Sequence, residues 1–151
     1  MSPAREWWEA VRRSARAIEP TLRELDALAD ADEGCLSWYP SGGGAGVRSG
    51  TSDPTADMAL RRTHDLDRII AETQGRLDEL EDVVGRALAL LTTITVDVSW
   101  RAAQAMELYY IDLADTWSEV ADALGVSRET IRADRDAVLA WCDSRPYLLL
   151  L

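Results

Sequence analysis

An apolar stripe from residue 59 to residue 91 constrains the fold more than any other feature. Its residues recur at three- and four-residue steps, the period of an amphipathic α-helix. They are Ala59, Leu66, Ile69, Ile70, Thr73, Leu77, Leu80, Val84, Leu88 and Leu91. Asp53 and Pro54 precede the stripe, and Asp is a good N-cap while Pro suits the first helical position. We therefore expect a helix from Pro54 to about Leu91, roughly 55 Å long at ~1.5 Å per residue.

A helix of this length needs a partner for its stripe. Residues 4–30 carry a second stripe of helical period, within which Pro20 predicts a kink or a break. Its residues are Trp7, Val11, Ala15, Ile18, Leu22, Leu25 and Leu28. The partner is either this first helix, folded back as a hairpin, or the same long helix of a second copy. A purely intramolecular helical bundle is the alternative to self-association.

Two segments interrupt the helical pattern. Residues 31–53 contain the glycine run 41–46 and predict a loop. This run has no Lys and no flanking strand, so it is not a phosphate-binding loop. Residues 92–96 are Thr or β-branched aliphatic side chains, which weaken a helix, and we expect a joint there.

The charge of the chain limits its partners. The 151 residues carry a net charge of -11, and all 16 basic residues are Arg. Nucleic-acid coating rests on neutralising phosphates with cations, so the composition argues against a general coat protein. Any contact with DNA must come from a local cluster of Arg, while the acidic remainder favours solubility.

No catalytic or metal-binding constellation is visible. Cys35 and Cys142 are far apart in the sequence, which favours two reduced thiols in a cytoplasmic protein. His64 with two nearby acids on different helix faces makes a poor metal site. The N-terminus lacks a signal-peptide pattern, and no apolar run approaches the length of a membrane span. We therefore expect no enzyme activity, no cofactor, no metal and no membrane partner.

Three short helices are expected after the joint. The first covers Trp100 to about Ile111. The second follows the capping box of Thr116 and Glu119 and ends at Gly125. The third has Ser127 as its N-cap and runs from Arg128 to about Asp143. We expect Trp100, Trp117 and Trp141 in the core of this unit, and the apolar tail 146–151 packed on a neighbouring element.

The second and third of these helices match a helix-turn-helix. Two helices that cross closely need a small residue at the crossing, which Ala121 supplies. The turn needs a residue that tolerates positive φ, which Gly125 supplies. The aliphatic residues Val120, Leu124, Val126 and Ile131 fall where the inner faces of the two helices would meet.

Two resemblances extend this pattern. Residues 106–139 resemble region 4 of bacterial sigma factors, above all in the run TWSEVADALGVSRETIR over 116–132. Residues 49–143 are similar to small phage-encoded regulators of the RinA and ArpU type. They share the element SGTSDPTA over 49–56, a long helix, and then LYYID over 108–112. The resemblance implies a role in regulating transcription from a phage or prophage genome.

The sigma-type module also implies the DNA contacts. In that module the start of the last helix enters the major groove, and Arg128, Glu129 and Arg132 match its DNA-contacting positions. Arg suits guanine or phosphate, and Glu accepts from the cytosine amino group. Thr130 and Arg135 lie near the same face. Three further candidates lie at helix N-termini, where backbone donors suit phosphate. They are Ser127, Thr116 and Trp117.

Two features depart from a strong DNA binder. Asp134 is an acid where such modules often have an apolar residue. Over 128–141 the three Arg of the last helix are balanced by three acids, although DNA binders usually present a basic stripe. We therefore expect weak intrinsic affinity, relieved by dimerisation or by RNA polymerase.

The sequence thus predicts an all-α protein with a long helical hairpin or coiled-coil-like N-terminal part and a small sigma-region-4-like bundle. The expected segments are a first helix 1–30, a loop 31–53, a long oligomerising helix 54–97, a DNA-binding domain 98–145 and a tail 146–151. The predicted function is sequence-specific binding of double-stranded DNA, as a homodimer or higher homo-oligomer. The alternatives are a small terminase subunit that recognises phage DNA for packaging, and a protein-interaction module that has lost DNA binding.

Overall fold

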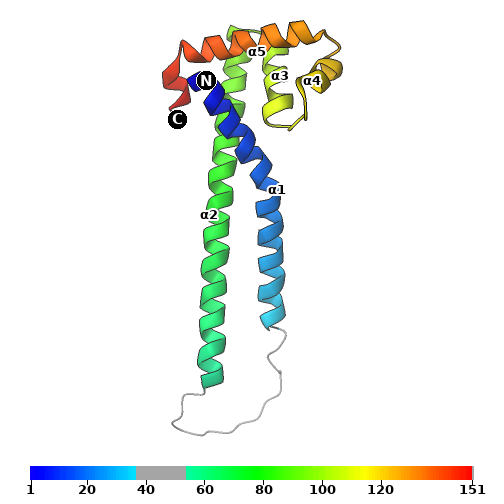
Figure 1. Ribbon diagram of the computed structural model, residues 1–151. Helices are drawn as coiled ribbons and strands as arrows, with labels where there is room; N and C mark the ends of the chain where they lie inside the picture. The colour runs from blue at the N-terminus through cyan, green and yellow to red at the C-terminus, as the bar shows by residue number, and fades with distance from the viewer. Residues whose placement is uncertain (37–53, 151) are drawn as a thin grey trace. The chain divides into compact units, whose positions relative to one another are not determined.

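The computed structural model describes residues 1–36 and 54–150, and within them every regular element is a helix. The predicted all-α class is therefore confirmed. The elements are α1 (Pro3–Leu36), α2 (Pro54–Asp97), α3 (Trp100–Tyr110), α4 (Trp117–Leu124), α5 (Arg128–Asp143) and the short 3-10 helix η1 (Pro146–Leu149) (Figure 1). The glycine run 41–46 and the expected cap Asp53 lie outside the described residues.

The chain divides into two compact units. Unit 1 combines residues 1–19 with residues 78–151, and unit 2 covers residues 20–77. Both long helices contribute to both units. The N-terminal part of α1 therefore belongs with the C-terminal helices, although the sequence-based division places residues 1–30 and 98–145 in separate segments.

Helix α1 is continuous through Pro20, so the break expected there does not occur. Pro20 is exposed, and so is Arg16, whose carbonyl loses its helical donor to the proline ring. Solvent can hydrate that carbonyl. The buried stripe slips by one residue at this point, because Thr21 is buried while Leu22, expected in the stripe, is exposed. The helix also extends to Leu36, beyond the end expected near residue 30.

Helix α2 begins at Pro54, as its sequence predicts, and continues to Asp97 without a joint at residues 92–96. Two hydroxyls in this segment bond back to the preceding turn: Thr95 Oγ1 donates to Leu91 O at 2.8 Å and Thr92 Oγ1 to Leu88 O at 3.3 Å. Such bonding suits Thr in a helix. The buried face also differs from expectation, because Ala87 is buried and Leu88 is exposed.

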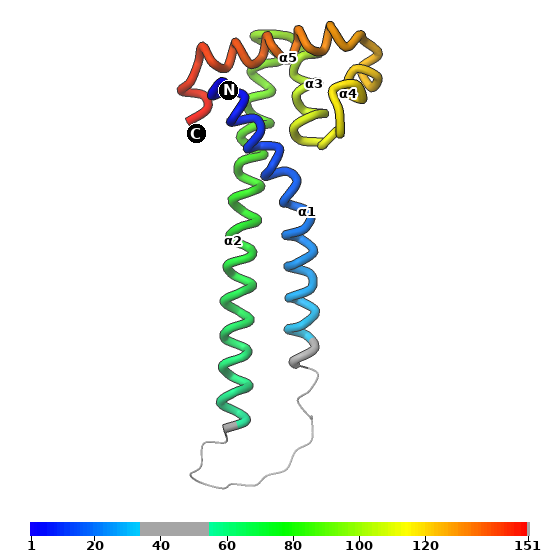
Figure 2. The backbone as a smooth tube through the Cα atoms, viewed as in Figure 1, coloured from blue at the N-terminus to red at the C-terminus, as the bar shows by residue number. Residues whose placement is uncertain are grey.

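The main core of unit 1 draws on four helices (Figure 2). Its buried residues come from α1 (Ala4, Trp8, Val11), α2 (Ala87, Leu90, Leu91, Ile94), α3 (Ala102, Ala103, Met106, Tyr110) and α5 (Val138, Cys142). Leu148 and Leu149 of the tail pack against this core, in line with the expectation for the tail. Trp117 and Trp141 also pack there, but Trp100 is exposed, contrary to expectation.

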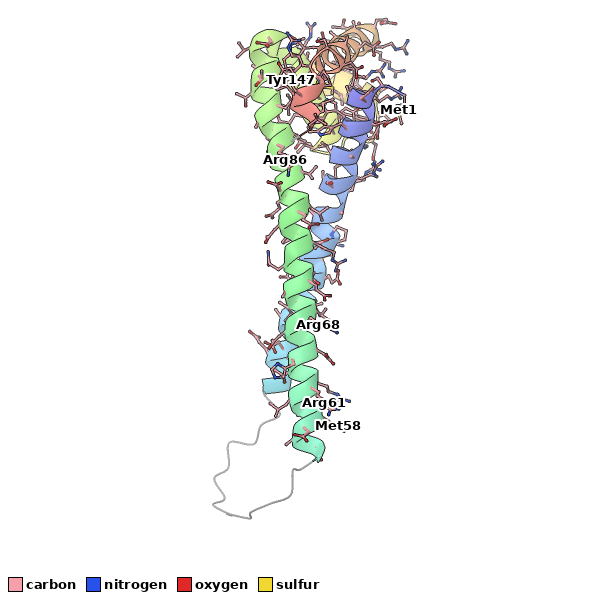
Figure 3. All side chains as sticks on the ribbon, turned by 90° about the vertical axis from the view of Figure 1, so that its left-hand side faces the viewer. Met1, Met58, Arg61, Arg68, Arg86 and Tyr147 are labelled. Atoms are coloured by element: carbon pink, nitrogen blue, oxygen red, sulfur yellow. The ribbon has the colours of Figure 1, made fainter. Side chains whose placement is uncertain are left out.

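Unit 2 is a pair of helical segments with little buried surface. Among its described side chains, Thr21, Thr73 and Leu77 are buried. The hydroxyl of Thr73 donates to Ile69 O at 2.8 Å, and Arg76 pairs with Glu24 at 3.2 Å across the two segments. Met58, Arg61 and Arg68, labelled in Figure 3, lie on the exposed surface of α2 in this unit.

Candidate nucleic-acid interface

Helices α4 and α5 are joined by the three-residue turn Gly125–Ser127. Gly125 has φ 66° and ψ 33°, a left-handed conformation that costs Gly little and other L-residues more. The N–H of Val126 donates to Ala121 O at 3.1 Å and that of Gly125 to Asp122 O at 3.2 Å. These two bonds form a Schellman motif, which satisfies the last carbonyls of α4. The glycine predicted for this turn therefore has the backbone conformation that the prediction requires.

Both helix starts on this surface are capped by hydroxyls. Ser127 Oγ accepts from Thr130 N at 3.1 Å and lies 2.9 Å from Thr130 Oγ1. Thr116 Oγ1 accepts from Glu119 N at 3.2 Å. The Glu119 carboxylate accepts from the N–H of Asp115 at 2.9 Å, rather than from the cap residue as a capping box predicts. The hydroxyls of Ser127 and Thr116 thus serve the helix caps.

A small apolar cluster fixes the angle between α4 and α5. Ala105, Val120, Ala121 and Ile131 are buried together, and Leu124 and Val126 pack against them. Ala121 is only 1% exposed, so a larger side chain at this position would have no room without a shift of the helices. The structure therefore brings together the aliphatic residues that the sequence predicts at the crossing.

Three arginines gather at the N-terminal end of α4. Arg128, Arg132 and Arg135 of α5 line a pocket of about 240 Å³ together with Trp117 and Ser118. No carboxylate is among its lining residues. Trp117 and Ser118 are the first two residues of α4, where the backbone N–H groups of a helix lack internal acceptors. Guanidinium groups and free amide donors are the chemistry of an anion site, and of phosphate in particular.

The three arginines differ in their own contacts. Arg135 pairs with the neighbouring Asp136 at 2.7 Å, and its guanidinium lies 5.6 Å from the centre of the Trp117 ring. Arg128 and Arg132 are exposed and make no hydrogen bond or ion pair with the described residues. Their guanidinium groups are therefore available to an external anion.

Glu129 and Thr130 lie outside this pocket, whereas Trp117 lines it and also packs on the core. Glu129 is exposed in the first turn of α5 and does not line the pocket. Thr130 is half-buried and bonded to Ser127. Trp117 is shared, because its ring stacks on Tyr109 at 4.1 Å as well as lining the pocket.

An ion pair accounts for the unusual acid in α5. Arg101 of α3 donates to both carboxylate oxygens of Asp134, at 2.6 and 3.1 Å. The hydrogen bond and the charge of Asp134 raise the pKa of the Arg101 guanidinium. Arg101 therefore neutralises an acid that the sequence counts against DNA binding. No local signal reveals this pair, because its residues are 33 positions apart.

A buried arginine of α1 holds the connection before α4. Arg12 is 4% exposed and donates to Tyr109 O and, at 2.9 Å, to Ala114 O. Its guanidinium also lies 4.0 Å from the centre of the Tyr109 ring. This connection includes Leu113, which has a positive φ of 64°. Arg12 thus orients α4 from the N-terminal helix, a role that sequence reasoning missed.

Neither a metal-ligand cluster nor a membrane-spanning helix is found in the part of the chain that the structure describes. Among residues 1–36 and 54–150, no group of three or more His, Cys, Asp or Glu side chains could hold a metal ion. No helix in the same ranges is long and apolar enough to cross a membrane. Comparison with protein-family models, curated proteins and solved structures found no match for this chain.

Proposed function

We propose that this chain is a sequence-specific DNA-binding regulator of transcription, of phage or prophage type. In this proposal α4, the turn and α5 form a helix-turn-helix, and the first turns of α5 enter the major groove. The observation that carries it is the pocket of Arg128, Arg132 and Arg135 at the N-terminus of α4. A chain of net charge -11 has little reason to bring three arginines together, two of them without an ion pair, unless they meet an anion.

The arrangement suits both positioning and base reading. The pocket can seat a backbone phosphate, which fixes the register of the protein on the duplex. Arg128 and Arg132 are one helical turn apart on α5, and Glu129 lies between them in sequence and exposed. Arg can read guanine and Glu can accept from cytosine, so either Arg could leave the phosphate for a base edge.

The charge around α5 predicts modest affinity for DNA. The pair of Arg101 with Asp134 removes one of the acids that oppose binding, but Glu129 and Asp136 remain exposed. Non-specific binding should therefore be weak at physiological salt. A second copy of the chain or RNA polymerase would supply the missing affinity by raising the effective concentration.

The test is binding to DNA tiles from the genomic neighbourhood of the gene, at a series of salt concentrations. Arg128→Ala/Arg132→Ala should lose affinity by at least tenfold, since one good contact contributes about 1–3 kcal/mol. The slope of log K against log salt should become shallower by about two if both groups contact phosphate. Arg61→Ala/Arg62→Ala is the matched control, because it removes two exposed arginines from unit 2.

Three results would contradict the proposal. If neither the wild type nor either variant binds DNA at low salt, the chain is better explained as a protein-interaction module that has lost DNA binding. Equal losses in the two double variants would mean that only the net charge matters. Specific binding by a ring of many subunits would favour the small terminase subunit instead.

A further inference from the structure

Residues 87–96 of α2 form its longest stretch without a charged side chain. The rest of α2 carries acids and arginines on its exposed surface, as a solvated helix does. In Figure 3, α2 runs along the front of the view, and Arg86 is labelled just before this stretch. A helix that is uncharged on all sides is normally covered on all sides.

The core of unit 1 covers only one side of the stretch. Ala87, Leu90, Leu91 and Ile94 are buried there. The opposite side carries the exposed residues Leu88, Ala89, Thr92, Thr93 and Val96. Val96 is 81% exposed, and Trp100 at the start of α3 is 62% exposed. Two large apolar side chains therefore project beside a stretch of α2 that has no charged side chain of its own.

Two apolar grooves border this surface on unit 1. The larger, about 460 Å³, lies between α2 and α3. Its lining includes the apolar residues Leu88, Val96, Trp100 and Ala103, and one charged residue, Glu107. The smaller, about 200 Å³, lies between α2 and the C-terminal tail and is lined by Ala89, Leu90, Thr93 and Leu148, with Arg86 as its one charged residue. One continuous surface thus offers both projecting apolar side chains and the hollows that would receive them.

We infer that a second copy of this chain docks here, with the two α2 helices crossing about a twofold axis near Thr92. A twofold interface uses the same patch on both copies and must be self-complementary, which the projecting side chains and grooves allow. Small exposed residues such as Ala89 and Thr92 let two helices approach closely. The low charge of this surface matters most, because two chains of net charge -11 repel each other wherever strongly charged surfaces meet.

The surface fits other partners less well. DNA is a polyanion and would gain little from a mainly apolar face that has no cluster of basic residues. The exposed apolar residues of unit 2, such as Met58 and Ile69, lie among arginines and acids, so a contact there would bury charge. The apolar stripe over residues 59–91, from which the sequence predicts self-association, includes Leu91. Because Leu91 is buried in the core of its own chain, it is not available to a second copy. The dimer surface inferred here does not depend on DNA binding.

The test is the mass of the full chain by sedimentation velocity over a range of concentrations, without DNA. The wild type should be a dimer that dissociates on dilution. Val96→Glu should weaken the dimer by at least a hundredfold, because each interface then holds two opposed acids. The fold should survive, since Val96 is exposed, and circular dichroism would verify this. Ile69→Glu is the matched control in unit 2 and should leave the dimer unchanged.

A second variant locates the axis independently of stability. In a Cys35→Ser background, Thr92→Cys should be joined to its symmetry mate by a short bis-maleimide, whereas Thr63→Cys should not. A wild type that stays monomeric at the highest concentration would overturn the inference. So would a dimer that Ile69→Glu disrupts and Val96→Glu does not, or cross-linking through Thr63→Cys alone.

Discussion

Units 1 and 2 share the same two long helices but differ sharply in what those helices bury. In unit 1, α1 and α2 meet α3 and α5 around a core that includes fully buried Trp8, Ile94 and Met106. In unit 2, two of the three described side chains that are buried are threonines. Burial of apolar surface is the main stabilising term in folding, so stability should be concentrated in unit 1. An apolar helical period therefore predicts that a segment is helical, but it does not predict how much that helix contributes to the stability of the fold.

The largest expected effect comes from truncating one core residue in each unit. Trp8→Ala removes a fully buried side chain whose ring lies 5.3 Å from that of Tyr110, and should cost about 3–5 kcal/mol. Ile70→Ala in unit 2 removes a half-buried side chain and should cost only about 1 kcal/mol. Urea unfolding followed by circular dichroism measures both. Equal costs would show that unit 2 stabilises the chain as much as unit 1 does.

The next largest effect concerns the buried arginine of unit 1. Arg12→Met should cost about 2–3 kcal/mol, because it leaves the carbonyls of Tyr109 and Ala114 without their donor. The neighbouring exposed Arg13→Met is the matched control and should change stability by less than about 0.5 kcal/mol. The measurement is the free energy of unfolding of each variant, compared with that of the wild type. If the two changes cost the same, Arg12 does not hold the connection before α4.

Two glycines, one in each unit, should respond in opposite directions. Gly125→Ala forces an L-residue to φ 66° and should cost about 1–2 kcal/mol, with Gly125→Asn closer to wild type. Gly75 lies inside α2, and an added Cβ meets no atom within 4 Å. Gly75→Ala should therefore stabilise unit 2 by about 0.5–1 kcal/mol. Thermal melts of the three variants provide the measurement, and a loss of stability in both alanine variants would contradict the helical assignment of Gly75.

Features that depend on neighbours in the sequence could be predicted. The start of α2 follows from Pro54, the starts of α4 and α5 follow from their capping residues, and the end of α4 follows from Gly125. The apolar cluster between α4 and α5 follows from helical spacing. In each case one short segment contains both the cause and the structure, so no tertiary information is needed.

Features that depend on residues far apart in the sequence could not be predicted. Whether Ala87 or Leu88 faces the core depends on where α3 and α5 lie, since both residues fit an apolar stripe. The helix survives Pro20 and the β-branched residues 92–96 because packing overrides local propensity. The contact of Arg12 with Ala114 joins positions 102 apart, and the partner of Asp134 is equally hidden from a local pattern. In the candidate interface, sequence reasoning found the arginines of α5 but missed Arg12, which holds the connection before α4, and Arg101, which neutralises Asp134.

The smallest expected effect is a loss of stability of unit 1 at alkaline pH, which comes from its buried thiol and phenol groups. Burial raises the pKa of the Cys142 thiol to about 11, whereas an unfolded thiol has a pKa near 8.5. Between these values the unfolded chain loses the proton and the folded chain keeps it. The unfolded state then binds fewer protons, so the free energy of unfolding should fall as the pH rises from about 9 to about 11. Burial raises the pKa of Tyr110 to about 12, which extends the loss to higher pH.

Cys142→Ala isolates the contribution of the thiol. This variant should be less stable than the wild type at neutral pH, because it leaves a small cavity in the core. The difference should narrow as the pH rises through about 9, since only the wild type loses the stabilisation of a neutral buried thiol. Urea unfolding at a series of pH values measures it, with Cys35→Ala as the control. Two curves that remain parallel would mean that water reaches Cys142 in the folded chain, and that the core of unit 1 is less closed than its burial indicates.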